Sequence, residues 1–133
     1  MVFGLEIQSM TLTKIVMHLA RNPEAGFAEG SREHGYLLVL PLTADGQIDE
    51  DLWHARRSDC SVRAFSPDAP VREGRLARRG HNWFFDYDRG GVDDDEPVFK
   101  LEQHRFEVGE YVTIRDHDET PLVYRIDGKE PLD

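Results

Sequence analysis

The clearest alternation of apolar and polar positions lies near the end of the chain. Residues 110–115 and 122–126 each alternate apolar and polar side chains, and they flank the polar run 116–121. A period of two is typical of half-buried strands, so this pattern predicts a β-hairpin that needs a cover for its apolar row. The apolar positions predicted to face the core are Val112, Ile114, Leu122, Tyr124 and Ile126.

Further strands are predicted along the rest of the chain. Residues 11–20 are rich in β-branched side chains, which favours a strand over a helix. The continuous apolar run at 35–40 suits a strand buried on both faces, and Pro41 would end it. Shorter predicted strands follow at 61–65, 73–79, 83–87 and 98–101.

The segments 73–79 and 83–87 predict a second hairpin around a turn at 80–82. Trp83, Phe85 and Tyr87 alternate with less apolar neighbours, which gives this hairpin one aromatic face. Because an aromatic face is large and apolar, the pattern favours a place for it in the core.

One helix is predicted, beginning after Asp49 as its N-cap. Ile48 before the cap and Trp53 at the fourth helical position have the spacing of a hydrophobic staple. The helix spans about two turns, so it is interpreted as a plug or lid, not as a framework element.

Seven or eight short strands with one short helix predict a mainly β fold, either a sandwich or a small closed or partly open β-barrel. The barrel is favoured because closure removes sheet edges that invite aggregation. A chain of 133 residues fits one domain, assigned here to residues 10–133. Residues 1–9 are interpreted as a leader segment outside this domain.

The charge and the cysteine content narrow the expected partners. The net charge is −10, so nucleic acid and anionic membranes are disfavoured, and no apolar run approaches the ~18 residues of a membrane span. Cys60 is the single cysteine, which makes the cytoplasm the expected compartment. A protein partner or self-association, as in a homodimer, is expected.

No cofactor or metal is predicted, although two features are metal candidates. The acidic run Asp93–Glu96 partly follows an EF-hand count, but Pro97 stands where a bidentate glutamate belongs. A barrel could also bring His34, His81 and His104 together, yet single histidines are more often hydrogen-bonded surface residues.

The region 56–85 departs from the acidic balance, since it carries seven arginines and three acids. Arginines beside aromatic rings can hold single-stranded nucleic acid, but here they are expected to pair with the acids of this chain or of a second subunit. Alternation places Arg75 and Arg79 on one face and Arg78 on the other. The candidate binding residues are Arg75, Arg78, Arg79, Trp83 and His104.

Several short motifs are spread between residues 11 and 126. They are His34-Gly35-Tyr36, Pro41-Leu42 with Asp45-Gly46, Trp83 with Phe85-Asp86-Tyr87, Asp94-Asp95-Glu96 and Gly109-Glu110-Tyr111-Val112. Together they resemble those of a group of short uncharacterised bacterial proteins. The resemblance implies no activity, ligand or catalytic residue.

Two functions are therefore expected. The first is a non-enzymatic binding or accessory module that acts through a protein–protein surface. The second is a small β-barrel enzyme, metal-dependent or acid–base, with a site built from His34, His104 and carboxylates. The first is preferred because the sequence has no catalytic spacing: nucleophile elbow, Walker loop and dinucleotide fingerprint are all missing.

Overall fold

A computed structural model describes residues 12–80, 82–87, 96–98, 101, 104–115 and 120–132. The chain is mainly β, and its strands form one antiparallel sheet with the order β6-β5-β4-β3-β2-β1-β8-β7. The strands are β1 (Leu12–Leu19), β2 (Ser31–Pro41), β3 (Ser61–Ser66), β4 (Ala69–Arg79), β5 (Asn82–Tyr87), β6 (Glu96–Pro97), β7 (Tyr111–Arg115) and β8 (Pro121–Pro131).

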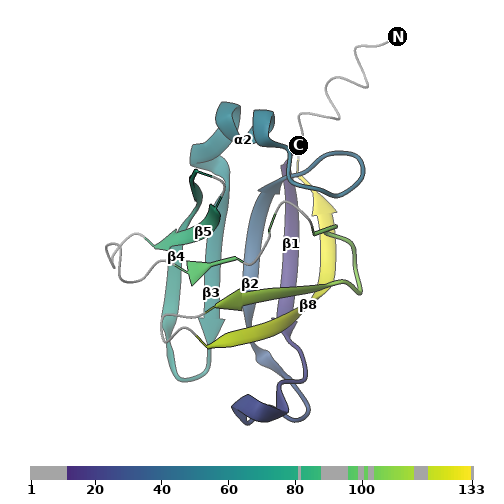
Figure 1. Cartoon of the computed structure of the whole chain (residues 1–133), viewed down its shortest axis with the longest axis vertical. Coiled ribbons are helices and arrows are strands. Elements are labelled where there is room, and N and C mark those ends of the chain that lie inside the picture. The colour runs from purple at the N-terminus through teal and green to yellow at the C-terminus, as the bar shows by residue number, and fades with distance from the viewer. Residues whose placement is uncertain are drawn as a thin grey trace.

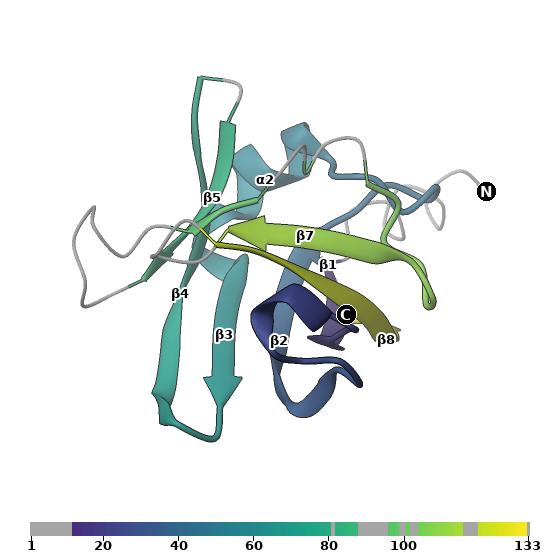
Figure 2. The ribbon, with the colours of Figure 1, turned by 60° about the horizontal axis from the view of Figure 1, so that its bottom comes forward.

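The sheet curls into a half-barrel, so the prediction of a partly open barrel is confirmed. In Figure 1, β7 and the first half of β8 cross in front of β1 and β2, and Figure 2 shows the same crossing from another side. The two ends of the sheet approach each other at the isolated bridge between Val98 and Ile114. Partial closure covers most of the inner face of the sheet with other parts of the same sheet.

The core fills the space inside this curl. The inward rows of both predicted hairpins are buried, with Phe85 and Ile126 at 0% exposure and Ile114 at 1%. Tyr124 is buried as well, and Leu122 packs against the core from its margin. The prediction of an inward aromatic row is also confirmed, because Trp83 and Tyr87 are each 4% exposed.

The predicted helix is α2 (Glu50–Arg56), which lies across one end of the sheet (Figure 1). Asp49 caps it, since its carboxylate accepts a hydrogen bond from the Leu52 amide at 3.1 Å. Leu52 and Trp53 are buried, and the indole of Trp53 donates to the carbonyl of Leu76 on β4 at 3.0 Å. Two 3-10 helices, η1 (Pro23–Ala25) and η2 (Arg57–Asp59), complete the elements that the structure describes.

The structure corrects the prediction that the strand at 35–40 is buried on both faces. In β2 the side chains of Leu38 and Leu40 are buried, whereas Leu37 and Val39 on the other face are only half-buried. A curled sheet has one inner face, and within the described residues no second layer covers the outer side of β2. Of the predicted strand 98–101, Val98 forms an isolated bridge with Ile114. The short strand β6 lies directly before it in the chain.

The predicted leader at residues 1–9 and the acidic residues 93–95 lie outside the described residues. Within the part of the chain that the structure describes, no helix is long and apolar enough to cross a membrane.

Candidate functional site

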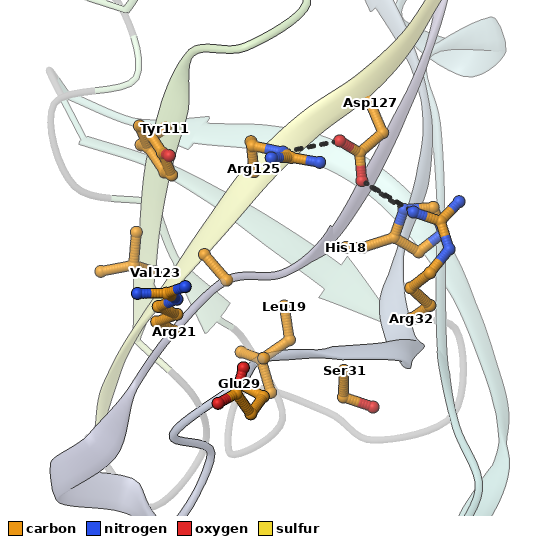
Figure 3. A pocket seen from close by; sticks show the side chains of 12 residues that line it. His18, Leu19, Arg21, Glu29, Ser31, Arg32, Tyr111, Val123, Arg125 and Asp127 are labelled. Carbon is orange, nitrogen blue, oxygen red and sulfur yellow. Dashed lines mark hydrogen bonds and ion pairs between the residues drawn. The ribbon is translucent and has the colours of Figure 1, made fainter.

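A groove of about 540 Å³ lies where the end of β1, the loop before β2 and the strands β7 and β8 meet (Figure 3). Most of its charged lining residues are arginines. We call it the arginine groove, and its polar side chains are His18, Arg21, Glu29, Ser31, Arg32, Tyr111, Arg125 and Asp127.

Strand pairing places three of these side chains in one row. His18 on β1 lies opposite Arg125 on β8, and Arg125 lies opposite Tyr111 on β7. Directly opposed residues of antiparallel strands share one face and have Cβ atoms about 5 Å apart. The row therefore faces outward, on the side of the sheet opposite the core.

Asp127 belongs to the same outward row. It stands two residues after Arg125 on β8, so alternation directs both side chains outward while Ile126 between them points into the core. Along β1 and β8, Met17 pairs with Ile126 but the next residue, Val16, pairs with Gly128, so Asp127 is the extra residue of a β-bulge. Its carboxylate reaches His18 on β1.

The Asp127 carboxylate holds two strands together by hydrogen bonds (Figure 3). One oxygen accepts from the Nε of Arg125 and the other lies against the Nδ1 of His18, both at 2.7 Å. Burial alone would raise the pKa of Asp127, but the hydrogen bonds from His18 and Arg125 and the positive charge of Arg125 outweigh it and lower that pKa. Asp127 is thus ionised at neutral pH, which makes Nδ1 of His18 the donor.

The same contact fixes Arg125. Its pKa is raised, first by the hydrogen bond to Asp127 and also by the charge of that carboxylate, against an opposing effect of burial. The Arg125 side chain stays 49% exposed. Asp127 engages the Nε atom, and Tyr111 on β7 also contributes to the raised pKa of Arg125.

The opposite side of His18 is supported by Phe65 and Gly35. Gly35 lies opposite both His18 on β1 and Phe65 on β3. A Cβ at Gly35 would overlap the carbonyl oxygen of Met17 and lie 2.8 Å from the Phe65 ring. The missing side chain lets Phe65 cover Gly35 and meet His18 edge to face at 6.1 Å.

The loop beside the groove is fastened by Asn22. Its side-chain amide donates to the carbonyls of Ala20 and Val123, and its oxygen accepts from the Val123 amide at 3.0 Å. Gly30, at a φ of 76°, packs so closely on β1 that a Cβ would lie 2.6 Å from the Leu19 carbonyl. Arg21, Glu29 and Arg32 are therefore carried on backbone that is pinned to β1 and β8.

The groove carries a net positive charge on an acidic chain. Its three arginines and two acids sum to +1 with His18 neutral, whereas the chain sums to −10. Arg32 is 76% exposed and forms a long ion pair with Asp127 at 3.9 Å. Arg21 makes no hydrogen bond or ion pair with any residue that the structure describes.

The chemistry available in the groove is that of an anion site. Guanidinium groups bind carboxylates and phosphates through several donors at once. The His18–Asp127 pair has the orientation of a general base, but His18 makes no hydrogen bond to a serine, threonine or cysteine in the described part of the chain. No group of three or more His, Cys, Asp or Glu among the described residues could hold a metal ion.

The structure places the predicted arginine residues on both faces of β4, as the alternation indicates. Arg75 and Arg79 face outward, where Arg75 donates to the Ser58 carbonyl at 3.2 Å and Arg79 lies over the Phe84 ring at 4.3 Å. Arg63 on β3 pairs with Glu73. These arginines are thus engaged by groups of the chain itself.

Arg78 lies on the inward row, at the end of the sheet that α2 covers. It forms an ion pair with Glu50 and lies over the ring of Trp83 at 5.4 Å. Trp83 is 4% exposed and packs edge to face on Trp53 at 5.1 Å. Arg78 and Trp83 therefore attach α2 to the sheet, and the buried indole offers no face for base stacking.

The predicted histidines contact different neighbours. His34 is hydrogen-bonded to Ser31 at 2.9 Å and packs on Phe27, whereas His104 packs edge to face on Phe106 at 6.4 Å. His81 and residues 93–95 of the acidic run lie outside the described residues. Hence neither the arginines of β4 nor His104 line the arginine groove.

Cys60 is fully buried, and its thiol lies 3.4 Å from the carbonyl of Arg56. Burial, aided by the negative charge of Asp59 and opposed by Arg56, raises the pKa of this thiol to about 11. A thiol with so high a pKa is protonated at neutral pH and is a poor nucleophile.

The groove residues were not singled out by the sequence patterns. Alternation puts Arg125 and Tyr111 opposite the apolar row of the C-terminal hairpin, and the structure has them on that face. His18 is a polar interruption at an outward position of β1, and this was the available signal. The partnership of His18 with Asp127 spans 109 residues and depends on the pairing of β1 with β8.

Comparison with known proteins gives no match: neither a family model, nor a curated protein, nor a solved structure is similar to this chain. The resemblance expected from the short motifs stays a prediction.

Proposed function

We propose that this chain is a non-enzymatic binding module that docks an acidic segment of a protein partner in the arginine groove. One observation carries the proposal: Arg21, Arg32 and Arg125 gather around a single groove of a chain with a net charge of −10. The rest of such a surface repels acidic partners at long range, so the groove orients them as they approach.

The state of the three arginines supports binding over internal pairing. Asp127 fixes Arg125 from one side, which lowers the conformational entropy that binding has to remove. Arg21 has no acidic partner among the described residues, and Arg32 is mostly exposed. Arg21 and Arg32 can therefore bind a carboxylate without first breaking a strong ion pair.

A carboxylate-bearing segment fits better than nucleic acid. Single-stranded nucleic acid is held by phosphate contacts together with exposed aromatic rings that stack on the bases. Of the aromatic residues that were candidates for stacking, Trp83 and Phe85 are buried in the core. Within the groove the exposed ring is that of Tyr111 alone.

The test is fluorescence anisotropy with fluorescein-labelled hexaglutamate at low salt. Arg21→Glu should weaken binding by about tenfold or more, because it replaces an attraction by a repulsion in the groove. Arg79→Glu makes the same change of charge on β4, outside the groove, and should alter the affinity by less than about twofold. Raising the salt concentration should weaken binding of hexaglutamate to the unaltered chain.

Three results would contradict the proposal. The first is no binding of hexaglutamate at millimolar protein. The second is an equal loss of affinity in Arg21→Glu and Arg79→Glu, which would indicate non-specific attraction. The third is displacement of labelled hexaglutamate by an equal concentration of unlabelled oligothymidine of the same length, which would favour a nucleic-acid partner.

The alternative function, a small acid–base or metal-dependent enzyme, has one observation in its favour. The Asp127–His18 pair fixes one imidazole nitrogen as a donor and leaves the other to act as a base. Elemental analysis and a thermal-shift screen with divalent metals separate the two functions. Stoichiometric metal, or a shift of several degrees at micromolar metal, would favour the enzyme.

A further inference from the structure

We infer that the docked segment continues from the arginine groove along β1 into a second hollow, so that it binds extended, with acidic residues at both ends and apolar residues between them. This inference rests on the function proposed above. It adds the length, conformation and residue pattern of the partner segment.

The second hollow has a volume of about 370 Å³ and lies on the outer face of β1 to β4. Half-buried apolar side chains of β2 form part of its lining, and cationic side chains surround them. We call it the lysine hollow, and the residues that matter here are Lys14, Leu37, Val39, Arg63, Glu73 and Arg75.

The outward row of β1 connects the two sites. Lys14, Val16 and His18 alternate along this row, with Lys14 in the lysine hollow and His18 in the arginine groove. Lys14 and His18 are four positions apart on the strand, which corresponds to about 13 Å. An extended peptide of about five residues spans that distance.

The space between the two sites is apolar. Val16 lies opposite Leu37 on β2 and opposite Gly128 on β8, and Lys14 lies opposite Val39. These valine and leucine side chains are half-buried, so part of their apolar surface is open to solvent. The apolar run of β2 has the composition of a strand covered on both faces, and an apolar residue of a partner would supply the second cover.

Both ends of this strip are positively charged. The arginine groove sums to +1, and Lys14, Arg63 and Arg75 against Glu73 give the lysine hollow +2. Arg63 is paired with Glu73, whereas Lys14 makes no ion pair with a residue in the described ranges. Lys14 is therefore the side chain that should report on binding in the hollow.

Two acidic ends bound by one strip act as linked sites. Once one end is held in the arginine groove, the other is confined near the lysine hollow, and its binding adds to the affinity without a second loss of translational freedom. An apolar residue between the ends adds burial over Val16 and Leu37. A compact acidic ligand would reach one site and gain neither effect.

The experiment compares two fluorescein-labelled peptides by anisotropy on the full chain. The first, Glu-Glu-Val-Thr-Val-Glu-Glu, has acidic ends and an apolar centre; the second, Glu-Glu-Gly-Ser-Gly-Glu-Glu, has the same charge and no apolar centre. The first should bind about threefold to tenfold more tightly. Lys14→Glu should weaken its binding by about fivefold, with Arg79→Glu as the matched control of equal charge change.

Val16→Ser separates the apolar contact from charge. It should weaken the first peptide by about threefold and leave the second within experimental error. Lys14→Gln removes the charge without reversing it and should show a smaller loss than Lys14→Glu. Thermal melts of each variant, within about two degrees of the unaltered chain, exclude a general loss of structure.

The outcomes distinguish this inference from the proposed function. If Lys14→Glu and Val16→Ser leave the affinity for the first peptide unchanged while Arg21→Glu weakens it, the extended mode is wrong and the groove function stands. If Arg21→Glu is also without effect, both are wrong. Equal affinity of the two peptides would likewise contradict an apolar centre.

Discussion

Asp127→Asn tests the hydrogen-bonded carboxylate that connects β8 to β1. The substitution keeps the shape of the side chain but removes the negative charge that accepts from Arg125 and His18 at 2.7 Å each. Because the Asp127 side chain is only 15% exposed, solvent replaces these contacts poorly. Loss of charge-assisted hydrogen bonds at such a site should cost about 1–2 kcal/mol of unfolding free energy at pH 7.

The pH dependence gives this prediction its sharper form. The pKa of Asp127 is lowered in the folded chain, so its contribution to stability is present above the unfolded pKa of about 3.9 and is lost as pH falls through the lower, folded value. The unaltered chain and Asp127→Asn should therefore differ at pH 7 and become more alike as the pH falls below about 4.

The assay is urea unfolding followed by tryptophan fluorescence at a series of pH values from 7 downward. In a parallel thermal melt of this chain of 133 residues, the same loss corresponds to a fall of roughly 3–10 °C in Tm at pH 7. Asp59→Asn is the control, because Asp59 is 54% exposed and pairs with Arg56 at the surface, where a change of at most about 0.5 kcal/mol is expected. A difference between Asp127→Asn and the unaltered chain that stays constant down to pH 3 would refute the reasoning.

Three further predictions concern the fold. Gly35→Ala should destabilise the chain by about 3 kcal/mol in urea unfolding, because the new methyl group overlaps the backbone of β1. Gly128→Ala is the control and should be mild, because its Cβ would lie 3.4 Å from a side chain. Equal effects of the two substitutions would contradict the close approach at Gly35. Ile114→Asp should lower the free energy of unfolding by about 4 kcal/mol or more, because Ile114 is 1% exposed. Thr113→Asp should lower it by less than about 1 kcal/mol, because Thr113 faces the other way. Similar melting temperatures of the two variants would contradict the assignment of faces. Cys60 should resist iodoacetamide at pH 8 in the folded chain and react in urea, because a pKa of about 11 leaves roughly one thiol in a thousand ionised; rapid labelling without denaturant would show that the thiol is accessible.

The amino-acid sequence determined the local elements of this protein. Alternation along β7 and β8 gave the strands and their buried rows, because the direction of a side chain in a strand follows from its position alone. The division of Arg78 from Arg75 and Arg79 was predictable for the same reason, and the capping of α2 by Asp49 from the preference of short acidic side chains for the N-cap. Each of these features depends on neighbours within a few residues.

Which faces are covered was decided only by the tertiary structure. The apolar run of β2 predicts burial on both sides, but the sheet curls so that Leu38 and Leu40 face the core and Leu37 and Val39 do not. Curling depends on how all the strands pair and twist, which no single segment encodes. The half-buried outer strip beside β1 is a consequence of that curl.

The arginine groove was also decided by tertiary structure. His18, Arg32 and Asp127 are remote in the chain and meet because β1 pairs with both β2 and β8. The meeting further depends on the register of β8 against β1, which sets Arg125 opposite His18 and leaves Asp127, on the same face, within hydrogen-bond reach of the imidazole. Sequence periodicity fixes the face of each side chain within its own strand, whereas strand order and register, which bring distant side chains together, follow from the packing of the whole chain.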